Sequence, residues 1–505
     1  MYIVTAKEMY DVDHYTMQEV GIEGKILMEN AGREIASKME KVLEKQAPIA
    51  VVTGPGNNGG DGFVIARYLL DHEYDVVVLQ AVPDEKVKGD AFYHKQLFLN
   101  CGGEIIVAID KETFQMHIKD KKFIVDAMFG IGVRETLRSP FDEFVSILNA
   151  GDQTVISVDI PSGLPADEGV QHFTAVKADY TFVVGAAKIS AFLPETSTYY
   201  GKWEKVDIGF PTFIFQKFAN QMIWTEEHFR ETMPTRDPFS HKGTHGRGVI
   251  VGGNDEMPGS ILMTTKAALK AGAGLITAAS TEKVISMIAH ASAESMYREL
   301  PDQNGYVIDD EKLDVKRFDA AAVGIGIGRN KQTEGLVRRV MEQTDGPVVV
   351  DADGLYHMKN CLDAVKNRTA PLIITPHPGE MAMLLDITVQ ELLATPFQYA
   401  RQFAMTYGIY VILKGKYTIV TAPDGKQVVH TTGNQGLAKG GSGDVLTGIV
   451  LAMVMQKQSI FHALCNACFI HGKSADLLVE SLHSHHDLLA TDVIDGISLV
   501  YRTYF

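Results

Sequence analysis

A glycine-rich loop near residue 55 carries side chains that could bind a ligand or a cation. The apolar run Ile49–Thr53 predicts a strand, and it leads into the segment GPGNNGGDG at residues 54–62, after which a helix is expected. Asn57, Asn58 and Asp61 would then stand at a helix N-terminus, where two amides and a carboxylate offer hard oxygen ligands as well as N–H donors. The alternative is purely structural: Asp61 would cap the helix while Asn57 and Asn58 shape the turn.

The same loop matches the spacing of a dinucleotide-binding fingerprint through Gly54, Gly56 and Gly59. A dehydrogenase of that kind needs an acidic residue at the end of the next strand, where it binds the ribose. The next predicted strand ends in VLQAV at residues 78–82, which contain no acid, and Asp75 lies at its start. The sequence therefore argues against a plain dehydrogenase.

Two acidic residues follow later predicted strands and would meet this loop. Asp126 ends one strand and is followed by GIGVRET at residues 130–136. Asp159 ends the next strand and runs into IPSG at residues 160–163. Residues just beyond the C-termini of strands converge on one crevice in open α/β sheets, so we expect these carboxylates to share a site with the glycine loop.

A second glycine-rich segment, GLAKGGSGDVLTG, occupies residues 436–448. Its small residues let backbone N–H groups point into an anion site at the start of a helix. Asp444 stands where a carboxylate could accept a proton from a hydroxyl that attacks a phosphoryl group. The segment lacks the lysine-serine ending of a P-loop, which argues against a Walker-type ATPase. A simple turn and cap at Gly443 and Asp444 is the alternative.

Apolar runs and amphipathic segments alternate through the first 210 residues, which is typical of a doubly wound α/β domain. The runs that predict buried parallel strands are residues 49–53, 75–79, 123–126, 154–159 and 181–185. Residues 210–236 break this rhythm and hold no obvious β–α unit. We therefore place a domain boundary near residue 222.

A second α/β series follows this boundary. Its predicted strands are residues 248–253, which run into a glycine turn, 320–324, 347–351 and 371–375. Residues 410–422 and 425–432 predict the two arms of a hairpin around Pro423-Asp424-Gly425. The sequence thus predicts two α/β domains, residues 1–222 and residues 223–505.

The composition excludes several classes of protein. Of the 505 residues, 46% are hydrophobic and 22% are charged, as in ordinary globular proteins. No stretch approaches the roughly 18 apolar residues of a spanning helix, and the first residues do not resemble a signal peptide, so we expect a cytoplasmic protein that does not act at a membrane. A net charge of −16 argues against nucleic-acid binding. Four cysteines are too few and too scattered for a disulfide framework.

His462, Cys465, Cys468 and His471 recur every three residues and suggest a zinc site. On a helix each step of three residues turns by about −60°, so the first and last side chains would point to opposite faces. One helix cannot wrap all four around a tetrahedral ion, and we interpret the cysteines as core residues.

Met9, Met17, Leu27 and Met28 give the first 30 residues the apolar periodicity of an amphipathic helix. Such a pattern is more typical of a core or oligomer contact than of a cofactor pocket. We therefore expect a homo-oligomer.

Four ordered motifs of the first half together resemble the NAD(P)H-hydrate epimerase family: LMENAG at 27–32, NNGGDG at 57–62, residues 126–132 and VDIPSG at 158–163. The resemblance implies a Rossmann-like domain that interconverts the R and S hydrates of NADH and NADPH at C6 of the nicotinamide ring. It assigns the hydrate to Asn57, Asn58, Gly59, Gly60, Asp61, Gly130, Ile131, Gly132, Val133, Arg134, Glu135, Thr136 and Asp159. It also assigns a potassium ion to Asn58, Asp126 and Ser162. As a hypothesis, Asp159 helps to move the proton or hydroxyl at C6.

The Gly-Ser-Gly-Asp element of the second loop resembles the anion hole and base of the ribokinase-like superfamily. HKGTHGR at 241–247, GIGIG at 324–328, DADGL at 351–355, TPHPGEM at 375–381 and KGK at 414–416 narrow this to the NAD(P)H-hydrate dehydratase family. The chain departs from the family at residues 325–327, where proline then leucine is more frequent, and at Ser260, where alanine is usual. Neither departure touches the proposed base.

This second resemblance implies dehydration of the S hydrate to NADH or NADPH, with ADP cleaved to AMP and phosphate and with Mg²⁺ accompanying the nucleotide. It assigns the hydrate to Ser260, Gly326, His377 and Asp444. It assigns the adenine nucleotide to Lys414, Gly415, Lys416, Tyr417, Thr418 and Gly443. In our interpretation Asp444 deprotonates the ring hydroxyl, which takes a phosphoryl group and then leaves as phosphate.

Two other functions compete with repair of the cofactor. A sugar or vitamin kinase fused to a nucleotide-binding regulatory domain would release a stable phosphorylated product. A noncatalytic cofactor-sensing scaffold would have no need for Asn58, Asp126 and Asp159 to converge.

Overall fold

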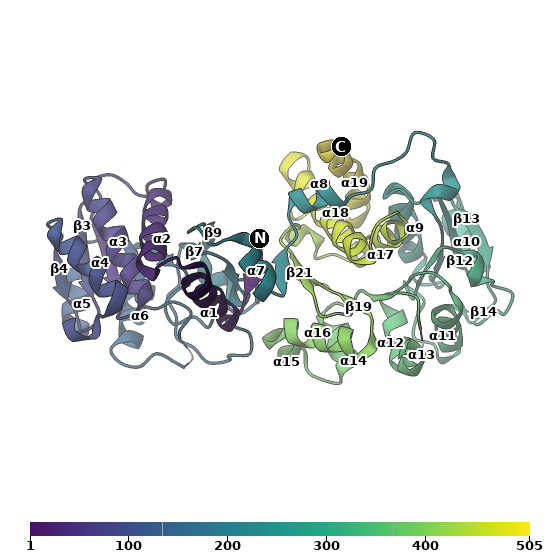
Figure 1. Cartoon of the computed structure of the whole chain (residues 1–505). Coiled ribbons are helices and arrows are strands. Elements are labelled where there is room, and N and C mark those ends of the chain that lie inside the picture. Colours follow the sequence, from purple (N-terminus) through teal and green to yellow (C-terminus); the bar gives the residue numbers. More distant parts are fainter. Residues whose placement is uncertain (134, 367) are drawn as a thin grey trace. The chain divides into compact units, whose positions relative to one another are not determined.

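The computed structural model describes residues 1–133, 135–366 and 368–505 of the chain. Its backbone divides into two compact units, Met1–Gln221 and Met222–Phe505 (Figure 1). Among the described residues, no helix is long and apolar enough to cross a membrane.

The first unit is built on a parallel sheet with seven strands in the described residues. In chain order these are β2 (Ile49–Thr53), β3 (Val76–Gln80), β4 (Ile105–Val107), β5 (Phe123–Ala127), β6 (Thr154–Val158), β7 (Tyr180–Val184) and β9 (Lys202–Val206). They lie side by side in the order β4-β3-β2-β5-β6-β7-β9, and each neighbouring pair is parallel. The five predicted strands are all present. Because the order reverses between β2 and β5, the C-terminal ends of these strands open a crevice.

Alternate residues of each strand pack on opposite faces of this sheet. On one face Val51 joins a core with helices α2 (Gly24–Met39), α3 (Asn57–Asp71) and α4 (Gly89–Asn100). On the other face Ala50 and Val52 pack with helices α5 (Lys111–Ile118) and α6 (Phe141–Ala150). This two-sided burial explains why the strands are apolar throughout rather than alternating.

The first 23 residues do not form the single amphipathic helix that their periodicity suggests. Strand β1 (Tyr2–Val4) pairs in parallel with β8 (Ala187–Lys188), and helix α1 (Ala6–Tyr15) follows at once. A π-helical turn and Gly21, at a φ of 84°, then separate α1 from α2. A left-handed residue ends a helix, so the apolar residues on either side belong to two elements.

The second unit is also built on a mainly parallel sheet. Its strands are β11 (Arg247–Val251), β12 (Leu275–Ser280), β13 (Met296–Glu299), β16 (Ala320–Val323), β17 (Val348–Val350), β18 (Leu372–Ile374), β19 (Tyr410–Leu413), β20 (Thr418–Thr421) and β21 (Gln427–His430). They are neighbours in the order β13-β12-β11-β16-β17-β18-β19-β20-β21. Strands from β13 to β19 are parallel, and β20 and β21 are antiparallel to their neighbours.

Two expectations for this region are wrong. Residues 410–422 form two strands, β19 and β20, because a turn containing Gly415 separates them. The predicted hairpin is real, but it joins β20 to β21. Residues 210–236 are not empty of regular structure, since they hold α7 (Thr212–Phe218), β10 (Gln221–Ile223) and α8 (Glu226–Thr232). These elements are too short to show a periodic pattern.

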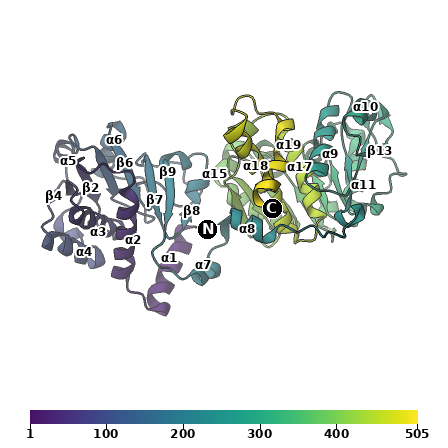
Figure 2. The ribbon, with the colours of Figure 1, turned by 90° about the horizontal axis from the view of Figure 1, so that it is seen from above.

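Helix α17 (Ser442–Val454) runs through the core of the second unit and is buried along almost its whole length. It packs against α9 (Pro258–Lys270) and α18 (Ile460–Ser481), and lies between them in two views (Figures 1 and 2). Gly448 permits the close approach of α9, because a Cβ there would lie 2.2 Å from the Thr264 carbonyl oxygen. The start of α17 is therefore held by a rigid core.

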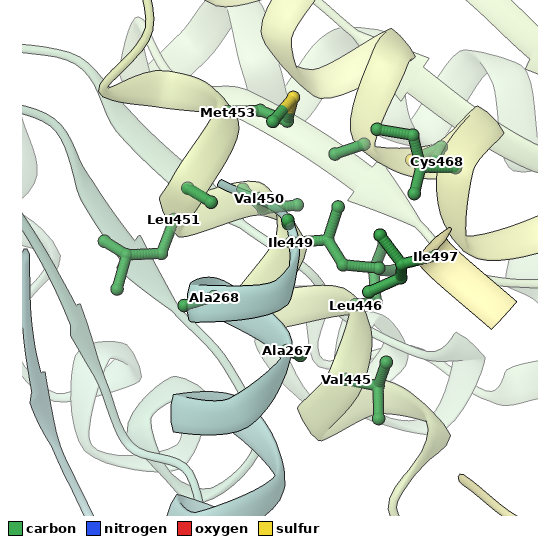
Figure 3. Close-up of a cluster of buried hydrophobic side chains, with 14 of the residues drawn as sticks. Ala267, Ala268, Val445, Leu446, Ile449, Val450, Leu451, Met453, Cys468 and Ile497 are labelled. Carbon is green, nitrogen blue, oxygen red and sulfur yellow. The ribbon is translucent and has the colours of Figure 1, made fainter. Parts of the chain in front are cut away.

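The predicted role of Cys465 and Cys468 as core residues is confirmed. Both lie in the apolar cluster around α17, and Figure 3 shows Cys468 together with Ile449 and Ile497. The described residues contain no group of three or more His, Cys, Asp or Glu that could hold a metal ion.

Candidate active sites

A cavity of about 560 Å³ opens at the crevice between β2 and β5 of the first unit. Most of the residues expected to hold the hydrate line it: Asn57, Asn58, Asp61, Gly130, Ile131, Gly132, Val133, Glu135, Thr136 and Asp159. Residues from α1, the π-helical turn and α2 complete the wall, among them Asp13, Met17 and Met28. The apolar N-terminal residues thus face a pocket as well as the core, which the sequence analysis did not foresee.

Two glycines expected at this site do not line the cavity. A Cβ on Gly59 would lie 2.2 Å from the Gly54 carbonyl oxygen, and one on Gly60 would lie 2.3 Å from the Met28 sulfur. These glycines are required by close packing at the start of α3. Arg134, also expected here, lies outside the described residues.

Asp159 adopts a left-handed conformation at the end of β6, with a φ of 66°. Its Oδ1 accepts hydrogen bonds from the Val184 backbone N–H, at 3.0 Å, and from the Lys188 ammonium. Lys188 also donates to the carbonyl oxygens of Val184 and Ala186, at 3.1 and 2.9 Å. These donors bind the ionised carboxylate, while Lys188 is held in one place.

Two further carboxyl groups, Asp13 and Asp61, line the same cavity. Burial raises the pKa of Asp13 to about 7; the charge of Lys188 opposes this rise and that of Asp159 adds to it. Burial also raises the pKa of Asp61 well above its usual range, and the charges of Asp159 and Asp13 add to this. Asp61 is not a helix cap, since α3 begins at Asn57 after Gly56 and has no side-chain cap.

Asp126 and Ser162, expected as potassium ligands, contact each other but are not among the lining residues of the cavity. The Asp126 carboxylate accepts hydrogen bonds from the Ser162 backbone N–H and the Ser157 hydroxyl, both at 2.8 Å, and from the Ser162 hydroxyl at 2.5 Å. Burial raises the pKa of Asp126, and these hydrogen bonds oppose the rise. In the described residues no cationic side chain pairs with Asp126, and the amide Nδ2 of buried Asn58 has no hydrogen-bond partner. A buried carboxylate without a counter-charge fits a bound cation.

A larger cavity, of about 890 Å³, lies in the second unit. The predicted residues that line it are His377, Lys414, Gly415, Lys416, Thr418, Gly443 and Asp444. Tyr417, Ser260 and Gly326 are not among its lining residues, although Ser260 neighbours both Asp444 and Gly326. A Cβ on Gly326 would lie 2.8 Å from that of Ser260.

The N-terminus of α17 forms one wall of this cavity. Gly441 precedes the helix at a φ of 92°, and no side chain caps it, so the first N–H groups are available to an anion. Asp444 lies in the first turn, which rules out the simple cap. Burial raises the pKa of Asp444 to about 6; the Asp351 charge adds to the rise, whereas Ser260 and Lys414 oppose it.

Lys414 faces the start of α17 from the end of β19. Its Nζ lies 3.0 Å from Asp351 Oδ1 and 3.9 Å from Glu380 Oε2, and a Cβ on Gly443 would lie 3.2 Å from it. Burial lowers the pKa of Lys414, but the two carboxylates outweigh this and the pKa is raised. The Thr447 hydroxyl donates to Asp351 Oδ2 at 2.7 Å and fixes that carboxylate. The Lys414 ammonium is thus held beside the start of α17, where an anion could bind.

Three polar side chains with buried polar atoms line the same cavity without complete hydrogen bonding. Within the described chain, both ring nitrogens of His430, Nε2 of His471 and Oγ1 of Thr432 have no partner. Burial lowers the pKa of His430 to about 3 and that of His471 to about 4, so both imidazoles are neutral at pH 7. Buried polar groups in proteins almost always have partners, so these atoms are suited to a polar ligand.

Comparisons with known proteins match both units. A family model described as NAD(P)H-hydrate dehydratase matches residues 248–498, and one described as YjeF-related protein N-terminus matches residues 24–190. The bifunctional NAD(P)H-hydrate repair enzyme of Moorella thermoacetica is 32% identical over 514 aligned positions, which cover 99% of this chain and 97% of that protein. This chain belongs to the family of bifunctional NAD(P)H-hydrate repair enzymes. Both predicted family resemblances are thereby confirmed.

Solved structures agree with the fold of the second unit. A ribokinase-like superfamily protein from Enterococcus faecalis V583 is 22% identical, with a TM-score of 0.50, and the match covers 56% of this chain and 96% of that one. This confirms the ribokinase-like architecture. The ADP/ATP-dependent NAD(P)H-hydrate dehydratase from Bacillus subtilis, co-crystallised with ATP and Mg²⁺, is 34% identical, with a TM-score of 0.49 over 56% of this chain and 98% of that one.

In this member of the repair family, several residues of the cavities escaped the sequence analysis. Lys188 could have been found as a lone cation in the apolar run VVGAAKIS, since a buried lysine needs a partner. Asp351 belongs to the DADGL motif at 351–355, but the sequence suggested no role for its carboxylate. Asp13 and His430 give no local signal, because neither stands in a recognisable motif. His471 belongs to the series with His462, Cys465 and Cys468, whose spacing does not reveal its place in the cavity.

Proposed function

We propose that this chain repairs hydrated nicotinamide cofactors in two steps. Residues 1–222 would interconvert the R and S forms of NADH hydrate and NADPH hydrate. Residues 223–505 would return the S form to NADH or NADPH while cleaving ADP to AMP and phosphate. The observation that carries this proposal is Asp444, a carboxylate in the first turn of an uncapped helix and across from Lys414, in a chain of the repair family.

In the first unit, Asp159 serves as a base at C6 of the hydrated ring. Its carboxylate is oriented by hydrogen bonds from the Val184 N–H and from Lys188. A carbon that bears both a hydroxyl and a ring nitrogen can lose the hydroxyl, because the nitrogen lone pair stabilises the resulting cation. Asp159 is placed to accept the proton of the water that adds back.

Potassium fits the residues expected to hold it. The Asp126 carboxylate and the Ser162 hydroxyl lie together, and with the amide oxygen of Asn58 they would supply the hard oxygens that such a cation prefers. Bound there, the ion would balance the buried charge of Asp126. Replacing potassium by sodium or choline in the epimerisation assay, with dehydration as the control, tests this assignment.

In the second unit, Asp444 accepts the proton of the ring hydroxyl as that oxygen attacks the terminal phosphoryl group of ADP. The first N–H groups of α17 and the Lys414 ammonium stabilise charge on the transferring group. The ring nitrogen then expels phosphate, a far better leaving group than hydroxide, and loss of a proton from the ring completes the double bond. Mg²⁺ in such sites is held largely by the nucleotide phosphates and water.

The uncharged wall formed by His430, Thr432 and His471 suits the base of the nucleotide. A neutral imidazole offers one donor and one acceptor, and a hydroxyl offers both. We place the base at this wall and the phosphates at Lys414 and Gly443.

The decisive experiment supplies the protein with a mixture of R and S hydrates and ADP. Complete return of the absorbance of reduced nicotinamide, with release of free phosphate, supports both activities. Conversion that stops once the S hydrate is consumed would support the dehydratase activity alone. A stable phosphorylated product would instead favour a kinase, and no turnover of either epimer would favour a scaffold.

A further inference from the structure

We propose that Asp13 is a second catalytic residue of the epimerase cavity and that it works with Asp159 as an acid–base pair acting on the two faces of the hydrated ring carbon. This inference rests on the proposed epimerase function. It adds a residue outside the segment matched by the family model, which begins at residue 24.

The fold brings Asp13 to the cavity through strand pairing at the N-terminus. Val4 of β1 pairs with Lys188 of β8, and α1 begins two residues after Val4. The direction of α1 is set by a capping box of Thr5 and Glu8, and by a 2.8 Å hydrogen bond from the Ala6 N–H to Asp167. Asp13, near the C-terminal end of this helix, therefore lines the cavity that also contains Lys188 and Asp159.

The two carboxyl groups have opposite environments. Asp159 accepts hydrogen bonds from the Val184 backbone N–H and from the Lys188 ammonium. No group in the described chain donates a hydrogen bond to the Asp13 carboxyl, and the charged groups that act on it are Asp159, Lys188 and Asp61. Burial brings the pKa of Asp13 to about 7, so it can carry a proton at neutral pH. Titratable pairs whose environments differ in this way are typical of an acid and its base.

Epimerisation needs such a pair, because the hydroxyl must leave from one face and water must add to the other. Asp13 gives its proton to the C6 hydroxyl, the C6–O bond breaks, and the lone pair of the ring nitrogen forms a C=N bond. Water then adds to C6 from the opposite face, a new C6–O bond forms, and Asp159 takes the proton from that water. The products are the other epimer and one water, with the proton moved from Asp13 to Asp159, and proton exchange with solvent water restores the pair before the next turnover.

Asp61 is less suited to this role. It lines the same cavity, and burial, together with the charges of Asp159 and Asp13, raises its pKa well above the usual range. A carboxyl whose pKa is raised in this way favours the protonated form, which donates a hydrogen bond to the substrate but is poorly suited to exchanging a proton in each turnover.

The test is Asp13→Asn, measured as the rate at which pure R hydrate gives S hydrate, without nucleotide and with the uncatalysed rate subtracted. The control is Asp11→Asn, on the same helix, because Asp11 pairs with Lys7 at 2.7 Å and does not line the cavity. We expect Asp13→Asn to lower kcat by about 10²–10⁴-fold with little change in KM, and Asp11→Asn to have no effect. Dehydration of S hydrate with ADP by the same samples reports on intact protein and should be unchanged.

The pH profile gives a second readout. The pair must share one proton, so the wild-type epimerisation rate should fall as the pH rises above about 7, where Asp13 ionises, and Asp13→Asn should lack this limb. Asp13→Asn epimerising at the rate of Asp11→Asn would overturn the inference, as would a wild-type profile without an inflection near this pH. A wild-type chain that does not epimerise at all would refute the proposed function instead.

Discussion

The ammonium of Lys188 and the carboxylate of Asp159 form a buried ion pair in the first cavity, with side chains 1% and 14% exposed. Lys188 uses its remaining donors on two backbone carbonyls, so the pair is fully hydrogen-bonded on the lysine side. This arrangement fixes the position of Asp159, and a substitution of Lys188 tests what the ion pair contributes.

Lys188→Met should destabilise the first unit and stop epimerisation. Removing one partner of a buried pair leaves the other charge without compensation, which costs about 3–5 kcal/mol. Chemical denaturation followed by a probe in the first unit measures the loss. The double variant Lys188→Met with Asp159→Asn should recover part of this stability but no activity. A single variant as stable as the wild type would show that the ion pair is not needed for folding.

Asp444→Asn should lower the dehydration rate by about 10²–10⁴-fold, because the variant cannot accept the proton of the ring hydroxyl. Nucleotide binding, measured by calorimetry, should change little. Epimerisation by the same chain serves as the control and should remain. Full dehydration by Asp444→Asn would show that another group is the base.

The wild-type dehydratase should lose activity in acid. The pKa of Asp444 is raised to about 6, so this carboxyl is protonated below that pH and ionised above it. Only the ionised form is a base, and kcat should therefore rise with pH through about 6 and then level off. A rate that stays constant from pH 5 to pH 8 would contradict the assignment.

Two glycines of α17 should respond differently to alanine. At Gly448 the new Cβ would lie 2.2 Å from the Thr264 backbone oxygen, so α9 must shift at a cost of about 1–3 kcal/mol. At Gly443 the Cβ would lie 3.2 Å from the flexible end of Lys414, which can move. Gly443→Ala should raise the KM for ADP with little loss of stability, whereas Gly448→Ala should lower stability. Equal melting temperatures for the two variants would contradict this packing argument.

His430→Leu should weaken nucleotide binding by about tenfold while kcat stays near the wild-type value. A net hydrogen bond contributes about 1–1.5 kcal/mol, and leucine removes both ring nitrogens at similar volume. Calorimetric titration with ADP measures the effect, and His462→Leu, which changes a ring outside the cavity, is the control. An unchanged Kd for ADP would remove His430 from the base site.

Much of the fold was predictable because its strands are buried on both faces. The strand Ile49–Thr53 is almost entirely apolar, so its composition alone predicts that both of its faces are buried. The turn at Gly415 was missed because β19 and β20 are both apolar and only four residues long. Strands β1 and β8 have three and two residues, too few for any periodic signal.

The candidate sites were predictable where their residues follow strands in recognisable motifs, as Asp126, Asp159 and Asp444 do. Asp13 and Lys188 are far apart in the chain and reach the cavity only through the pairing of β1 with β8. The significance of His430 and His471 comes from buried ring nitrogens without hydrogen-bond partners, which neither residue's sequence context reveals. Such properties arise from tertiary packing.

Helix α17 begins at Ser442, carries Asp444 in its first turn and is buried along almost its whole length. A protein engineer who wishes to change the nucleotide preference should therefore leave the glycine segment alone, because a library directed there would select mainly for survival of the fold. Strand β21 and the inner face of α18 present His430 and His471 to the cavity without forming the anion site. Randomising these two positions would test nucleotide recognition with less risk of destabilising the fold.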